Sequence, residues 1–276
     1  MLGFSYRVVK GMTAAASLAV AAMYCNAVYA HPTQTVEYAQ WSHLSIPAEP
    51  GSDGTVEALL GDDLPPEQYG LSGNWLIYSF DSVAYQYRFV ELNEPLRANT
   101  GYWLFQTVAE SVELDIPENL PAVSGDASAG CIQGSRCASV PLTGNGSTGV
   151  WNMVGYSSDS NNTFGDTRFI TASGPCVSGC TPAQARAANI VMDIMYTLND
   201  AGTAYDLITE SSAMQAWDGY WLLVLPDADQ LRWIIPVADD EDPPTVPSDT
   251  TLRAEENADG FCLVDGDIER DHPGFT

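Results

Sequence analysis

An internal match constrains the fold of this chain more than any other feature. Residues 75–104 align without a gap with residues 193–222, an offset of 118 positions, and seven of the aligned residues are identical. The identities are the pairs Tyr78/Tyr196, Tyr87/Tyr205 and Ala98/Ala216, and the four letters GYWL at 101–104 and 219–222. Self-similarity at a fixed offset predicts that one structural unit occurs twice.

The match extends outward in both directions. Trp41 in WSHLSIP corresponds to Trp151 in WNMVGYS, and SVELDIP at 111–117 corresponds to QLRWIIP at 230–236. These limits predict two homologous modules at 41–117 and 149–236. The intervening residues 118–148 are rich in Gly, Ser, Ala and Pro, which is typical of a linker. Residues 237–276 are acidic with few large apolar side chains, so we expect a disordered tail.

Within each unit the hydrophobic pattern has the period of strands. Tyr85, Tyr87 and Phe89 alternate with polar residues, and residues 112–116 alternate in the same way, as half-buried antiparallel strands do. The segments TVEALL (55–60) and TPAQARAANIV (181–191) predict short helices, the second with a capping box between Thr181 and Gln184. We therefore expect a mainly β fold: two tandem modules of antiparallel strands, each with one short helix, followed by the acidic tail.

The GYWL segments are apolar on both sides. Tyr102 and Leu104 alternate with Trp103 and Phe105, and the second copy repeats the pattern. A strand that is apolar on both faces is typically central and covered on both sides. We therefore expect Trp103 and Trp221 to be buried, and ligand-binding residues to lie where the two copies differ.

The N-terminal segment and the cysteines indicate in which cellular compartment the protein acts. Residues 1–30 place Arg7 and Lys10 before a short Ala-rich apolar run that closes on small residues, which predicts a signal peptide cleaved after Ala30. The close pairs Cys131/Cys137 and Cys176/Cys180 predict two disulfide loops, with a four-thiolate metal site as the less favoured alternative. We expect a secreted or cell-surface protein, with the periplasm also open. Cys262 would be left to pair with another chain.

The charge restricts the partners. With 36 acidic and 10 basic residues the formal net charge is −26, so the surface repels nucleic acid and anionic membranes. The expected partner is an exported protein or an extracellular glycan, with no membrane insertion once the signal peptide has been removed.

The motifs WLIYSFD, YQYRF and GYWL in the first unit, and GVWNMVGYS, IMYTLN, YDLI and AWDGYWLL in the second, resemble the tandem tryptophan-rich β modules of secreted and cell-surface bacterial proteins. Such units open on a GWNLVG-like strand and close on a Gly-aromatic-Trp strand. The resemblance implies an accessory or repeat unit, often beside a catalytic or adhesive domain, that is not itself catalytic. The first unit departs from the pattern, because WSHLSIP replaces GWNLVG.

Catalytic residues are scarce. The chain has three histidines, His31, His43 and His272, and no serine in a GxSxG elbow. We therefore expect a non-catalytic exported binding or assembly protein, acting in adhesion or in glycan or protein binding. A secreted hydrolase that uses paired carboxylates is the alternative. A copper histidine-brace enzyme that begins at His31, with His43 as second ligand, is a more remote one.

Two further sets of residues are candidates for binding. The alternating acids of DGDIERD could hold calcium; they are Asp265, Asp267, Glu269 and Asp271. The oxygen-rich loop at 157–167 is a second calcium candidate. For a sugar or another ligand, the candidates lie near turns or lack an aromatic counterpart in the other copy; they are Asn74, Trp75, Tyr85 and Trp217.

Overall fold

The structure is a computed structural model that describes residues 31–237, except 119, 126–129, 132–135, 159–161 and 229, together with residues 253–257 and 260–264. The chain divides into two compact units. One contains the body at 31–237. The other contains a hairpin of β14 (Arg253–Asn257) and β15 (Gly260–Val264), paired antiparallel. The predicted signal peptide and the calcium candidates Asp265, Asp267, Glu269 and Asp271 lie outside the described residues.

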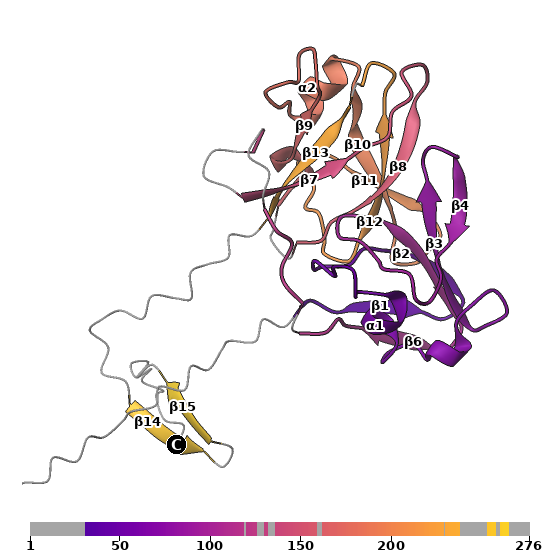
Figure 1. Cartoon of the computed structure of the whole chain (residues 1–276), viewed down its shortest axis with the longest axis vertical. Coiled ribbons are helices and arrows are strands. Elements are labelled where there is room, and N and C mark those ends of the chain that lie inside the picture. The colour runs from indigo at the N-terminus through magenta and orange to yellow at the C-terminus, as the bar shows by residue number, and fades with distance from the viewer. Residues whose placement is uncertain are drawn as a thin grey trace, which may run out of the picture. The chain divides into compact units, whose positions relative to one another are not determined.

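The named strands of the body pair antiparallel in four sheets, which confirms the predicted mainly β fold (Figure 1). Its first half has a four-stranded sheet in the order β2-β5-β3-β4 and a two-stranded sheet of β1 and β6. The strands and helices of this half are β1 (Gln34–Glu37), β2 (Gln40–Leu44), α1 (Val56–Leu60), a 3-10 helix at Pro66–Gln68, β3 (Trp75–Asp81), β4 (Gln86–Phe89), β5 (Tyr102–Gln106) and β6 (Ser111–Leu114).

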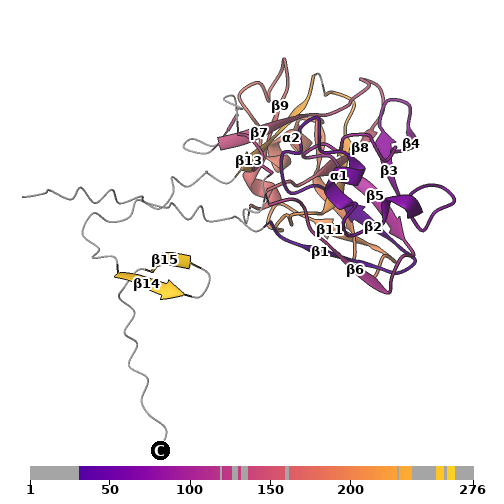
Figure 2. The same cartoon turned by 60° about the horizontal axis from the view of Figure 1, so that its bottom comes forward.

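The second half has a four-stranded sheet in the order β8-β12-β10-β11 and a three-stranded sheet in the order β7-β13-β9. In both views the three-stranded sheet lies on the opposite side of the body from the β3-β4 hairpin (Figures 1 and 2). The elements of this half are β7 (Arg136–Pro141), β8 (Val150–Gly155), a 3-10 helix at Phe164–Asp166, β9 (Arg168–Ile170), α2 (Pro182–Ala187), β10 (Val191–Leu198), β11 (Tyr205–Ile208), β12 (Gly219–Val224) and β13 (Arg232–Val237).

The two four-stranded sheets have the same strand order, and the pairs at the GYWL strands have the same register, although β10 carries an irregularity between Val191 and Met195. Tyr78 of β3 pairs with Trp103 of β5, and Tyr196 of β10 pairs with Trp221 of β12. Each GYWL strand therefore lies between two partners, β2 and β3 in the first half and β8 and β10 in the second.

Both predicted helices form, and their ends follow from local chemistry. The side chain of Thr55 accepts a hydrogen bond from the amide of Ala58, and Thr181 and Gln184 form the expected capping box. The second helix ends at Ala187, earlier than the pattern predicts. Asn189 adopts a left-handed φ of 57°, and the apolar residues that follow begin β10.

Each half has its own apolar core. Trp75 and Tyr102 belong to the core of the first half, whereas Tyr220 and Trp233 belong to that of the second. Trp217 crosses this division: it precedes β12 in the second half but packs in the core of the first, and its indole N–H donates to the carbonyl of Pro32. The halves of the body are therefore interlocked.

The two predicted disulfides are present, Cys131–Cys137 and Cys176–Cys180, with Cα atoms 5.8 and 5.1 Å apart. Intrachain bridges of this kind are typical of proteins outside the reducing cytoplasm. Among the described residues, no helix has the length and apolar character needed to cross a membrane.

Candidate functional site

The three residues of each GYW motif have three different environments. Tyr102 and Tyr220 point into the cores and are 4% and 0% exposed. Their hydroxyls accept hydrogen bonds from the amides five residues earlier, Arg97 at 2.9 Å and Gln215 at 2.8 Å. The tyrosines therefore anchor the turn that leads into each strand, and they are structural.

The glycines lie at the boundary between the halves. A Cβ on Gly101 would lie 2.6 Å from the carbonyl oxygen of Val154 in β8, and a Cβ on Gly219 would lie 3.3 Å from that of Leu44 in β2. Val154 and Leu44 pair with the tyrosines of the two motifs, Tyr220 and Tyr102. Each motif thus packs its glycine against the opposite half, where a Cβ would collide at Gly101 and would be tightly packed at Gly219.

The tryptophans lie on the other face of the strands, away from the cores. Trp103 is only partly buried and meets the ring of Trp41 edge to face, with centroids 6.0 Å apart. Trp221 is 9% exposed and meets Trp151 in the same manner at 6.4 Å. The expectation that both indoles are core residues is therefore wrong for Trp103. Trp221 is buried as expected, but by aromatic rings that surround a cavity.

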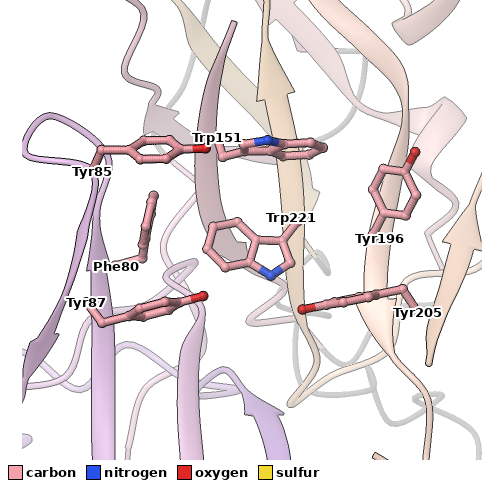
Figure 3. A pocket seen from close by; sticks show the side chains of 7 residues that line it. All are labelled: Phe80, Tyr85, Tyr87, Trp151, Tyr196, Tyr205 and Trp221. Atoms are coloured by element: carbon pink, nitrogen blue, oxygen red, sulfur yellow. The ribbon is translucent and has the colours of Figure 1, made fainter. Parts of the chain in front are cut away.

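That cavity has a volume of about 440 Å³ and is lined by seven aromatic side chains from both halves (Figure 3). They are Phe80, Tyr85, Tyr87, Trp151, Tyr196, Tyr205 and Trp221. Figure 3 shows Trp221 at the centre and Trp151 above it, with Phe80, Tyr85 and Tyr87 on one side and Tyr196 and Tyr205 on the other. Phe80 and Trp221 are in edge-to-face contact at 4.9 Å.

A second cavity of about 410 Å³ adjoins the first and is lined by Trp41, Tyr78, Tyr87 and Trp103. Tyr87 lines both, so the two cavities share this side chain, and we refer to them together as the aromatic groove. The rim is open to solvent: Tyr85, Tyr87, Tyr205 and Trp41 are 61%, 54%, 49% and 39% exposed. Large exposed aromatic surfaces of this kind mark binding sites more often than they mark chance exposure.

The lining of the aromatic groove is aromatic and uncharged throughout the described residues. Polar groups enter it only as tyrosine hydroxyls and indole N–H groups; the hydroxyls of Tyr87 and Tyr205 point toward one another across the groove (Figure 3). Partial burial raises the pKa of Tyr87, and the neighbouring Tyr205 raises it further. Tyr87 therefore stays a neutral donor and acceptor at physiological pH.

The ligand-binding candidates from the sequence separate in the structure. Tyr85 lies on the rim of the aromatic groove. Trp75 and Trp217 are 0% and 1% exposed, which corrects their assignment, because an indole enclosed in a core offers no face to a ligand. Asn74 lies outside the groove lining and donates to Oε1 of Gln68 at 2.7 Å.

Most of the groove was missed because its residues were attributed to the shared core. Tyr78, Trp103, Tyr196 and Trp221 are at equivalent positions in the two copies, and that repetition suggested a structural role. The available signal was the alternation itself: on the GYWL strands, both tryptophans occur on the opposite side from the buried tyrosines.

A separate polar cavity of about 300 Å³ lies where the halves meet. Its lining includes His43, Glu37, Asp200 and Asp218. Burial lowers the pKa of His43 to about 4, against a smaller opposing effect of the Gly219 carbonyl, which lies 2.8 Å from Nδ1. Burial raises the pKa of Asp218 to about 7; a hydrogen bond from Tyr220 opposes this shift, and the charge of Asp200 adds to it. Near neutral pH the cavity thus holds a neutral imidazole and a carboxyl close to its titration point.

The metal hypotheses receive no support from these contacts. Nε2 of His31 lies 3.2 Å from the carbonyl oxygen of Leu120, whereas His43 contacts Gly219, so the two rings proposed for a copper brace have different partners. Within the described ranges, the ligand atoms of one cluster of acidic residues lie close enough together to share a cation. The cluster consists of Asp62, Asp63 and Asp115. In it, Oδ2 of Asp63 already accepts the amide of Asp115 at 2.9 Å. The copper and calcium sites stay predictions.

Comparison with known proteins returns no match to a family model, to a curated protein or to a solved structure. The function is therefore inferred from the geometry of the chain itself.

Proposed function

We propose that this protein is an exported, non-catalytic binding protein whose ligand is a neutral extracellular glycan held in the aromatic groove. The observation that carries the proposal is the seven-membered aromatic lining of the larger cavity, to which both halves contribute. The sugar rings of a glycan present apolar C–H faces to aromatic rings and hydroxyls to polar groups. The groove offers both kinds of partner, because its tyrosines combine a ring with a hydroxyl.

The charge of the groove lining and of the whole chain narrows the range of ligands further. The described lining carries no ionised side chain that could pair with a charged sugar, and the net charge of −26 repels anionic polymers. A neutral polysaccharide needs no ionised partner and is not repelled by the net charge. Export is supported by the two disulfides and by the signal-peptide pattern of residues 1–30. The resemblance to tryptophan-rich surface modules and the repeated strand order support a duplicated accessory unit.

The test is affinity electrophoresis of the chain from residue 31 to 276 in gels containing soluble neutral polysaccharides: β-glucan, mannan, xylan and galactan. We expect at least one to retard the protein. Trp221→Ala should abolish the retardation, whereas Tyr38→Ala should not, because Tyr38 is an exposed tyrosine that does not line the groove. Absence of retardation by every polysaccharide, or equal retardation of the wild type and Trp221→Ala, would overturn the proposal.

The polar cavity favours a second candidate function, glycan hydrolysis. Hydrolysis with paired carboxylates needs one acid with a raised pKa and a second that is ionised. Asp218 has the raised pKa, and Glu37 and Asp200 line the same cavity. The test is release of reducing ends from the polysaccharide that binds. If the wild type releases reducing ends and Asp218→Asn does not, while the polysaccharide still retards both proteins, the protein is an enzyme. Absence of turnover leaves the binding function alone.

A further inference from the structure

We infer that the two cavities of the aromatic groove are consecutive subsites for one extended polysaccharide chain, with Trp103 and Trp221 as their equivalent platforms. The inference rests on the proposed function and specifies its ligand: a polymer long enough to cross from one half of the body to the other, and not a mono- or disaccharide.

Ring contacts link most of the rings in each cavity. In the smaller one, Trp41 contacts Trp103 at 6.0 Å and Tyr78 at 6.1 Å. In the larger one, Phe80 contacts Trp221 at 4.9 Å, and Trp151 contacts Tyr196 at 5.9 Å. Tyr87 joins the two, because it lines both cavities and lies 5.3 Å from Phe80. Aromatic surface therefore extends from one platform to the other by way of Tyr87.

The platforms are equivalent in construction. Trp103 pairs across the sheet with Tyr78, and Trp221 pairs with Tyr196. On the other neighbouring strand, Trp41 and Trp151 are opposite Phe105 and Leu223, two positions beyond the respective platforms. Two similar subsites that face a common groove suit a ligand that is itself repetitive, since each copy can meet the same kind of sugar unit.

The size of the groove also favours a polymer. Each cavity alone, at about 440 and 410 Å³, is within the ~300–1,000 Å³ typical of small-molecule sites. When a second subsite is linked to the first through the same ligand, its occupation becomes intramolecular, and affinity rises without new chemistry. Chain length should therefore control affinity.

Other ligands of aromatic grooves fit less well. A proline-rich peptide presents carbonyl acceptors and few donors, whereas sugar hydroxyls both donate and accept, as the four tyrosine hydroxyls of the larger cavity do. A quaternary ammonium ion is bound by aromatic faces, but it would fill one end of the groove and make no use of its length.

The test is calorimetric titration of the full mature chain with cello-, manno- and xylo-oligosaccharides of about two to about eight sugar units. We expect affinity to rise at least about tenfold with length and then level off. Trp103→Ala should remove most of this gain and leave the affinity for the shortest ligands nearly unchanged. Tyr87→Ala, at a 54% exposed position, tests the junction of the subsites without disturbing a core, and Tyr38→Ala is its matched control.

The outcomes separate the inference from the function it rests on. Binding with the same affinity at every length, or an unchanged length dependence in both Trp103→Ala and Tyr87→Ala, overturns the two-subsite inference and leaves glycan binding intact. Absence of binding to every oligosaccharide and to the polysaccharides removes both. A proline-rich peptide or benzyltrimethylammonium that binds in the groove more tightly than any saccharide assigns the groove to that ligand and overturns the inference as well.

Discussion

The ring of Phe80 meets the ring of Trp221 edge to face, with centroids 4.9 Å apart and planes inclined by 80°. Phe80 belongs to β3 in the first half of the body and Trp221 to β12 in the second. The floor of the aromatic groove is therefore assembled from both halves, and any change that moves the halves apart must also open the groove.

This contact should be measurable as a coupling energy. We expect a double-mutant cycle of Phe80→Ala and Trp221→Ala, followed by urea unfolding, to give a coupling of about 0.5–1.5 kcal/mol, the range for aromatic pairs beyond area burial. A cycle of Tyr38→Ala with Trp221→Ala should give a value near zero. Equal couplings in the two cycles would contradict a direct contribution of the ring pair.

The boundary glycines should differ in their tolerance of a methyl group. Gly101→Ala places a Cβ 2.6 Å from a backbone oxygen, which cannot move aside easily, whereas the tightest contacts for Gly219→Ala are 3.3 Å. We expect Gly101→Ala to lower the free energy of unfolding by about 1–3 kcal/mol, as overpacking does, and Gly219→Ala to lower it less. Thermal unfolding of the two variants gives the order directly, and the reverse order would contradict the boundary geometry.

The core tyrosines should be sensitive to loss of a single hydroxyl. In Tyr220→Phe the partly buried amide of Gln215 loses its acceptor at 2.8 Å, and the loss of such a hydrogen bond costs about 0.5–1.5 kcal/mol. Tyr102→Phe should behave alike through Arg97. Tyr85→Phe, at a 61% exposed position, should leave stability within about 0.5 kcal/mol of the wild type. Chemical denaturation of the three variants tests the set.

The polar cavity predicts a specific dependence of stability on pH. The folded-state pKa of Asp218 is raised from 3.8 to about 7, so the folded protein holds a proton there that the unfolded chain has released. Between pH 4 and 7 this group lowers stability as pH rises, by up to about 1.4 kcal/mol per unit. Asp218→Asn should therefore match the wild type near pH 4 and exceed it above pH 7.

His43 acts in the opposite sense over part of the same window. Its folded-state pKa is lowered from 6.5 to about 4, so the unfolded chain takes up the proton first and stability falls as pH drops below 6.5. In the wild type the two slopes oppose one another between pH 4 and 6.5. Asp218→Asn should reveal the histidine slope, with stability rising with pH up to about 6.5. A flat profile for Asp218→Asn in this window would contradict the assignment.

Much of the fold follows from local pattern. The alternation in residues 85–89 and in the GYWL segments predicts strands because period two is visible without knowledge of the partner strand. Thr181 and Gln184 identify the start of the second helix for the same reason, since a capping box is a local device. The identical register of the tyrosine and tryptophan pairs agrees with the sequence alignment that suggested two related units.

The groove could not be predicted in the same way. A strand with two apolar faces has the same pattern whether a core or a row of rings beside solvent covers the second face. Only the meeting of two sheets decides this, and that meeting depends on contacts such as Gly101 with Val154, which lie far apart in the sequence. Trp75 and Trp217 show the converse, since their positions near turns suggested exposure although both pack in a core.

Hydrogen bonds between uncharged groups cross the boundary between the two halves, and this bears on how the protein responds to salt. The amide of Gly155 donates to the carbonyl of Asn99, Ser157 accepts the amide of Asn99, and the ring of His43 meets Gly219; each is a contact between uncharged groups. Dissolved ions weaken attraction between opposite charges and leave such contacts almost unchanged, while they relieve the mutual repulsion of an acidic chain. We therefore expect the free energy of unfolding to rise with salt concentration and to be lowest at low ionic strength.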